Sequence, residues 1–74
     1  MEPILVLSSI TYAMKARDLL KDNGIPSLLT RSAAIRRVRG CGYGVRIARE
    51  HRTKAEELLD AAGIHVLGIA FEKQ

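Results

Sequence analysis

Hydrophobic positions follow the same order in two stretches of the chain: a short apolar run and then an apolar stripe at helical spacing. In the first stretch, Ile4 to Ser8 predicts a strand, and Ser8-Ser9 can cap the helix that follows. We expect this helix to end at Asn23-Gly24 and a second strand to run from Ile25 to Thr30, with Pro26 suited to a strand start or an edge. The predicted core stripe of the helix is Ala13, Ala16, Leu19 and Leu20.

The second stretch repeats the first at a constant offset of 39 residues, at which Lys15 to Leu20 matches Lys54 to Leu59. Strands are predicted from Tyr43 to Ala48 and from Ile64 to Phe71, with Gly68 suited to a bulge. The helix between them fits a capping box at Thr53 to Glu56, although the repeat would start it about two residues earlier. Its predicted core stripe is Ala55, Leu58, Leu59 and Ala62, and Gly63 is its stop.

A duplicated strand-helix-strand unit in so short a chain predicts an α+β fold. The expected arrangement is the ferredoxin-like β-α-β-β-α-β order, a four-stranded antiparallel sheet with two helices on one face. This architecture hosts many activities, so the repeat does not indicate a function. It does place Cys41 in the connection between the second and third strands, or at the start of the third.

The size of the chain limits it to one domain over residues 1–74, near the lower bound for a self-sufficient core. A homodimer would enlarge that core and stays open. A single cysteine allows no internal disulfide, which favours a reducing compartment. The first residues resemble no signal peptide, and no apolar run approaches the roughly 20 residues of a membrane span. We therefore expect a cytoplasmic protein that does not enter the membrane.

Positive charge is concentrated in the middle of the chain. The net charge is +4, and no Asp or Glu occurs between Asn23 and Arg49. The helical segments carry mixed charge, as solvated faces usually do. An anionic ligand or partner is expected for the middle segment. Its arginines are Arg31, Arg36, Arg37, Arg39, Arg46 and Arg49.

Cys41 is the strongest candidate for chemistry. A thiolate is the reactive form of cysteine, and the neighbouring guanidinium groups of Arg37, Arg39 and Arg46 would favour it. Gly40 and Gly42 remove side-chain bulk on both sides, so another molecule could approach the sulfur. A buried structural cysteine is the competing interpretation. The glycines and arginines favour a sulfur presented on a basic loop.

No other residues form a catalytic or metal-binding pattern. The carboxylates fall mostly on helix surfaces among lysines, without a paired acid and base. His51 and His65 have no metal-site spacing with Cys41, and surface or helix-start positions are expected for both. We therefore expect no enzyme, no resident cofactor and no metal.

A nucleic-acid interface is the alternative for the basic segment from Arg31 to Arg52. The residues from Arg39 to Val45 partly match the RNA-recognition-motif consensus in the third strand. However, Cys41 stands where that motif has an aromatic residue, and the first strand has no aromatic residue to stack a second base. A domain that docks on an acidic protein through the same segment also stays open.

The chain resembles the selenium/sulfur carrier-like family of small bacterial proteins from about Ile4 to Ile69. The resemblance is carried by the strand ending at Ser8-Ser9, the Asn23-Gly24-Ile25 helix end and the Gly63-Ile64 pair. Between them, a basic segment leads into Cys41-Gly42, and Arg46 follows in the next strand.

This resemblance implies a non-enzymatic carrier in sulfur or selenium metabolism. Cys41 would accept sulfur or selenium as a transient persulfide-type adduct from a donor protein and pass it to an acceptor by thiol exchange. Arg39 and Arg46, with Arg37, would lower the thiol pKa and stabilise the anionic adduct.

Overall fold

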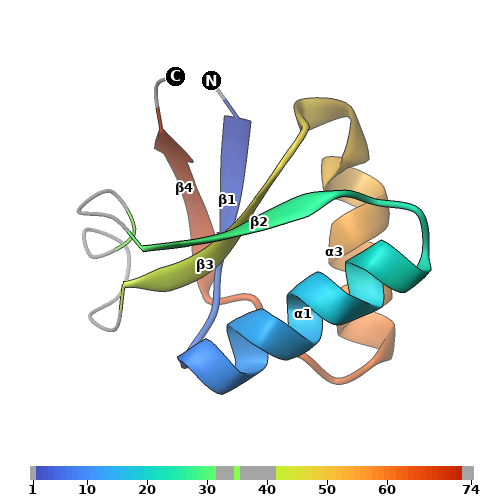
Figure 1. The fold of residues 1–74 in the computed structure, drawn as a ribbon, viewed down its shortest axis with the longest axis horizontal. Coiled ribbons are helices and arrows are strands. Elements are labelled where there is room, and N and C mark those ends of the chain that lie inside the picture. Colours follow the sequence, from blue (N-terminus) through green and yellow to red (C-terminus); the bar gives the residue numbers. More distant parts are fainter. Residues whose placement is uncertain (1, 32–34, 36–41, 73–74) are drawn as a thin grey trace.

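The computed structural model describes residues 2–31, 35 and 42–72, which form a four-stranded sheet and two α-helices (Figure 1). The strand order is β2-β3-β1-β4, and every neighbouring pair is antiparallel. This is the predicted ferredoxin-like order. In chain order the elements are β1 (Glu2–Val6), α1 (Ile10–Asp22), β2 (Ser27–Arg31), β3 (Tyr43–Ile47), the 3-10 turn η1 (Arg49–His51), α3 (Arg52–Ala61) and β4 (Gly68–Glu72).

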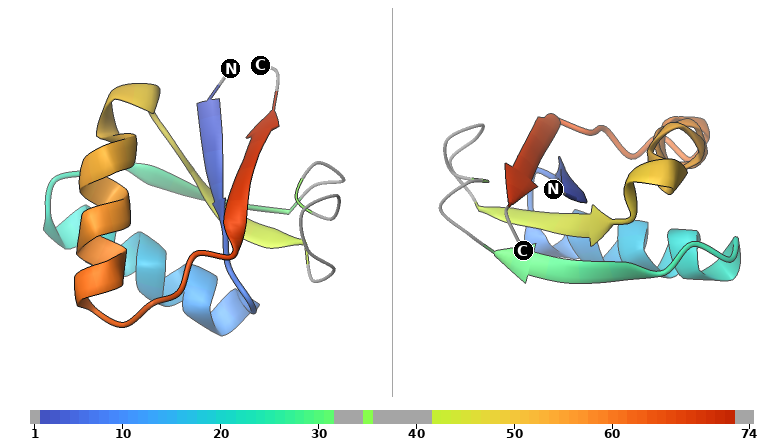
Figure 2. Two further views of the ribbon diagram at one scale, coloured as in Figure 1. Left: turned by 180° about the vertical axis from the view of Figure 1, so that it is seen from behind. Right: turned by 90° about the horizontal axis from the view of Figure 1, so that it is seen from above.

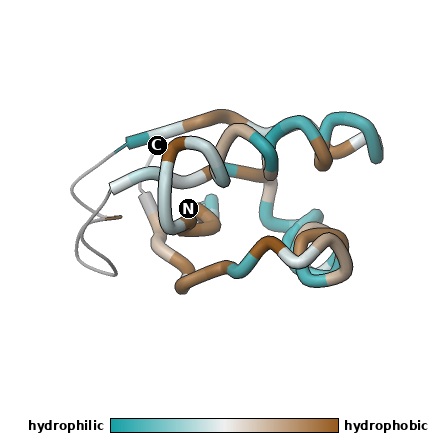
Figure 3. Tube along the Cα trace, turned by 90° about the horizontal axis from the view of Figure 1, so that it is seen from below, coloured by the Kyte–Doolittle hydropathy of each residue, from teal (hydrophilic) through white to brown (hydrophobic). Residues whose placement is uncertain are grey.

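The molecule has two layers, with α1 and α3 on the same face of the sheet (Figure 2). Both helices alternate between hydrophobic and hydrophilic positions along their length, as elements with one buried side do (Figure 3). We call the side of the sheet that faces away from the two helices the open face. The first and last described residues lie beside each other, because Glu2 on β1 is opposite Glu72 on β4 (Figure 1).

Helix α1 begins and ends at the predicted residues. The Ser9 side chain accepts a hydrogen bond of 3.2 Å from the backbone N–H of Tyr12, which satisfies one free donor of the first turn. At the other end Gly24 has a φ of +77°, and the Ile25 N–H donates to the Leu20 carbonyl at 2.8 Å. This closure requires the left-handed backbone conformation that glycine adopts readily.

Helix α3 stops just before Gly63, as predicted, and Gly63 has a φ of +74°. The capping box predicted for the start of the helix is wrong. The helix begins at Arg52, so Thr53 lies inside its first turn, and no side chain caps it. The turn η1 leads into it, with the His51 N–H donating to the Ala48 carbonyl at 3.0 Å. The earlier start indicated by the repeat is correct.

Strand β4 is shorter than predicted and contains no bulge at Gly68. Its register with β1 is continuous from Val6 opposite Gly68 to Glu2 opposite Glu72. The residues from Ile64 to Leu67 instead carry the chain from α3 to the sheet, and the Leu67 N–H donates to the Val6 carbonyl at 2.8 Å. Strand β2 lies at one edge of the sheet, which suits the preceding Pro26, but it begins at Ser27 rather than at the predicted Ile25.

Strand β1 is buried on both sides, and each side belongs to a separate hydrophobic cluster. Leu5 and Leu7 pack with the helices, whereas Ile4 and Val6 pack on the open face. Most of the predicted helix stripes are buried in the helix-side cluster, but Ala62 is exposed. The buried members of that cluster are Leu5, Leu7, Ala13, Ala16, Leu20, Ile25, Val45, Ile47, Ala55, Leu59 and Ile64.

Gly44 on β3 is required by the close approach of β1. A Cβ atom at Gly44 would lie 2.7 Å from the Leu5 carbonyl oxygen and 2.8 Å from Cγ2 of Ile4. The first of these neighbours is backbone and cannot rotate away. The glycine therefore allows the two central strands to pack this closely.

We expect Gly44→Ala to lower the free energy of unfolding by about 1–3 kcal/mol, because the added methyl overpacks the β1–β3 contact. Chemical denaturation would measure the change. Thr30→Ala is the matched control, since Thr30 lies opposite Gly44 on β2 and its substitution costs about 1 kcal/mol or less. A Gly44→Ala protein as stable as the control would contradict the packing argument.

Candidate functional site

The predicted site residues fall partly within the described chain. Cys41, Arg37, Arg39 and Gly40 lie outside the described residues, so their predicted roles stay predictions. Gly42 and Arg46 are described. Cys41 does belong to the connection between β2 and β3, as the sequence predicted, because that connection runs from residue 32 to residue 42.

Gly42 is buried and has a φ of +80°, a backbone conformation that most residues avoid. It directly precedes Tyr43, the first residue of β3. The sequence suggested Gly42 for the access that it gives to the neighbouring sulfur. The structure adds a second reason for glycine, because the chain enters the sheet through a left-handed residue. Gly42, the residue directly after Cys41, therefore has a fixed backbone conformation in the fold.

Ile35 attaches the same connection to the open face of the sheet. Its side chain is fully buried against Ile4, Val6 and Ala70, and Leu67 packs against the group. The segment that carries Cys41 is therefore short and bounded by two buried residues, Ile35 and Gly42. Sequence reasoning missed Ile35, although a lone isoleucine among arginines and small residues is a signal for such an anchor.

Arg31 and Tyr43 form a pair at the end of the sheet where the connection leaves and returns. They lie opposite each other in the β2–β3 register, and the Arg31 guanidinium carbon is 5.2 Å from the centroid of the Tyr43 ring. Such a contact is worth about 0.5–1 kcal/mol at an exposed position. The contact holds the Arg31 guanidinium beside Tyr43, which is two residues after Cys41 in the sequence. The sequence analysis treated Arg31 only as part of the basic segment.

Arg46 lies on the open face, toward the other end of β3. Its Nε is 3.6 Å from Oε1 of Glu2, and its side chain is only 24% exposed. At about 3.3 Å per strand residue, its Cα lies roughly 13 Å along the chain from that of Gly42. An effect on Cys41 would thus act through the field of the guanidinium over a distance rather than through adjacent backbone.

The arrangement does not favour the nucleic-acid interpretation. An RNA-recognition motif stacks bases on the uncovered face of its sheet. Here Tyr43 packs against the helix-side cluster, and Ile35 covers part of the open face. Tyr12, on α1, and Phe71, on edge strand β4, lie on different elements. The described residues provide no aromatic platform for stacking.

The described part of the chain holds neither a metal-ligand cluster nor a membrane-spanning helix. His51 and His65 belong to no group of three or more His, Cys, Asp or Glu side chains that could hold a metal ion there. No helix among the described residues is long and apolar enough to cross a bilayer.

Comparison with known proteins identifies the family. A family described as "Putative Se/S carrier protein-like" matches residues 2–70, nearly the whole chain. The chain belongs to this family, as its resemblance suggested. No curated protein and no solved structure is significantly similar to it.

We expect Ile35→Ala to lower the free energy of unfolding by about 2–5 kcal/mol, because it leaves a cavity over β1. Leu28→Ala is the control: Leu28 lies on edge strand β2 and is 53% exposed, so its loss costs about 0.5 kcal/mol or less. Urea titration of both variants would measure the difference. Equal stabilities would show that Ile35 does not anchor the connection.

Proposed function

We propose that this protein is a non-enzymatic carrier that holds sulfur or selenium on Cys41. The observation that carries the proposal is family membership over residues 2–70, which includes the Cys41-Gly42 pair. The geometry around that pair supports it. Ile35 and Gly42 are both buried, so the two ends of the segment that contains Cys41 are fixed in the fold.

The proposed loading step is a thiol exchange. The Cys41 thiolate attacks the outer sulfur of a persulfide on a donor protein, and the bond between the donor's two sulfur atoms breaks. The donor leaves as a thiolate, and Cys41 becomes the persulfide. No net oxidation occurs, because one S–S bond forms as another breaks. A donor carrying selenium as its outer atom would load Cys41 in the same way.

The neighbouring arginines would favour both the thiolate and the loaded anion. Arg37 and Arg39 lie within four residues of Cys41 in the sequence. Arg31 adds a cation held at the same end of the sheet by its contact with Tyr43. Nearby positive charge lowers a thiol pKa, since it stabilises the charged form. Arg46 would contribute less, because it is farther along β3 and is paired with Glu2.

The first test is the pH dependence of Cys41 alkylation in the folded protein. We expect its midpoint below the value of about 8.5 for an ordinary thiol, and a shift toward higher pH in Arg39→Gln. Lys54→Gln is the charge-matched control on α3, and its profile should stay unchanged. An ordinary titration, or a sulfur that reacts only after unfolding, would remove the basis of the carrier proposal.

The second test is direct loading. Incubation with a small-molecule persulfide should add roughly 32 Da to the protein, or roughly 80 Da with a selenium analogue, as intact mass spectrometry would show. The adduct should be absent from Cys41→Ser and should transfer to a thiol acceptor. A stable adduct that no thiol can remove would argue for trapping of the sulfur rather than transfer.

A further inference from the structure

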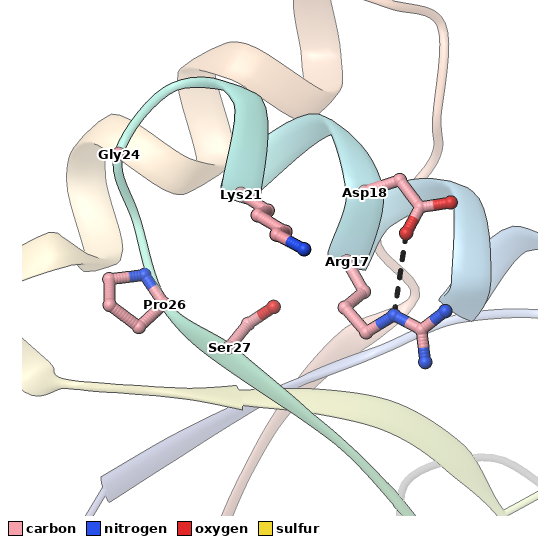
Figure 4. A pocket seen from close by; sticks show the side chains of 6 residues that line it. All are labelled: Arg17, Asp18, Lys21, Gly24, Pro26 and Ser27. Atoms are coloured by element: carbon pink, nitrogen blue, oxygen red, sulfur yellow. Dashed lines mark hydrogen bonds and ion pairs between the residues drawn. The ribbon is translucent and has the colours of Figure 1, made fainter.

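A second candidate site lies between the C-terminal half of α1 and the start of β2. It is a cavity of about 550 Å³ (Figure 4). Small-molecule sites in proteins usually have volumes of this order. The cavity has two cationic side chains, one carboxylate, a hydroxyl and a proline ring around it. Its lining residues are Arg17, Asp18, Lys21, Gly24, Pro26 and Ser27.

The two cations share one face of α1. Arg17 and Lys21 are four residues apart, so they lie one turn from each other beside the buried stripe of the helix. Like charges at this spacing repel each other, and an anion between them would relieve the repulsion. Asp18 offsets part of this charge, since its Oδ1 accepts a hydrogen bond from Arg17 Nε at 3.4 Å. No hydrogen bond or ion pair joins the terminal nitrogens of Arg17 to the described residues.

Ser27 supplies an independent observation. Its Oγ is buried, yet it has no hydrogen-bond partner among the described residues. Buried hydroxyl groups in proteins almost always have one. Figure 4 shows that the Ser27 oxygen and the Lys21 nitrogen point into the same space between helix and strand. A ligand oxygen placed there would accept hydrogen bonds from both.

We propose that this cavity binds a tetrahedral oxyanion of the phosphate class, held by Lys21 and the Ser27 hydroxyl, with Arg17 adding positive charge at its edge. An oxyanion offers several acceptor oxygens, which matches a set of donors that converge from two elements. The proline ring and the stems of the two long side chains leave room for an apolar group on the anion. Free phosphate and a phosphomonoester therefore share this chemistry.

The site is separate from Cys41 and does not depend on the carrier proposal. Strand β2 begins at Ser27, in the cavity, and ends at Arg31, where the connection that carries Cys41 begins. These two strand ends are about 13 Å apart at the usual rise per residue. Cys41→Ser should consequently bind the anion as the unchanged protein does, so either proposal can fail alone.

The test is an NMR titration of the ¹⁵N-labelled chain with inorganic phosphate, at constant ionic strength against chloride. We expect saturable shifts of the Lys21, Gly24 and Ser27 amides, and binding about tenfold weaker in Lys21→Gln. Lys54→Gln, on α3, is the matched control and should bind normally. Shifts that chloride reproduces, or equal weakening in both variants, would overturn the proposal.

Two further variants distinguish a binding site from a charged surface. Ser27→Ala should weaken phosphate binding and leave the thermal midpoint of the free protein unchanged or higher, because the hydroxyl it removes has no partner. A lower midpoint would mean that Ser27 bonds within the protein, against the proposal. Asp18→Asn should tighten binding, since it removes a repelling charge; unchanged binding would place the anion elsewhere.

Phenyl phosphate, titrated in the same way, separates the two sources of the anion. Tighter binding than inorganic phosphate would assign the site to a phosphomonoester whose apolar part contacts Pro26. Equal or weaker binding would assign it to the free anion. Failure of both probes to bind would overturn the proposal.

Discussion

Burial of β1 on both sides is the constraint on which the rest of the fold depends. All residues from Pro3 to Leu7 are buried, so the strand needs an apolar cover on each face. The two helices cover Leu5 and Leu7 on one side. On the other, Ile35 packs on Ile4 and Val6. A domain of this size has few other apolar groups to exclude water there.

That constraint connects stability with the proposed function. The residue that covers the open face belongs to the same connection as Cys41, and the close packing of β3 on β1 at Gly44 sets where this connection ends. Ile35 thus has two effects: it completes the core over β1, and it attaches the connection that contains Cys41 to the sheet.

The basic side chains of the described residues lie at several separate positions around the sheet. Arg31 stands at the end of β2 beside the Cys41 connection, whereas Arg17 and Lys21 lie beside the start of the same strand. Arg46 is partly neutralised by Glu2 on the open face. The net charge of the chain therefore describes several local environments: Arg17 and Arg46 have acidic partners, whereas Arg31 lies against the Tyr43 ring.

The sequence by itself determined the fold class, the ends of α1 and the stop of α3, because the repeat, Ser9 and the two glycines act through neighbouring residues. It also made Cys41 the candidate for the proposed chemistry, by residue type and the glycines and arginines beside it. Only the tertiary structure decided what depends on contacts between distant residues. The cover over Ile4, the steric need for Gly44 and the meeting of Lys21 with Ser27 arise where separate elements pack. Periodicity describes one element at a time and contains no information on such contacts.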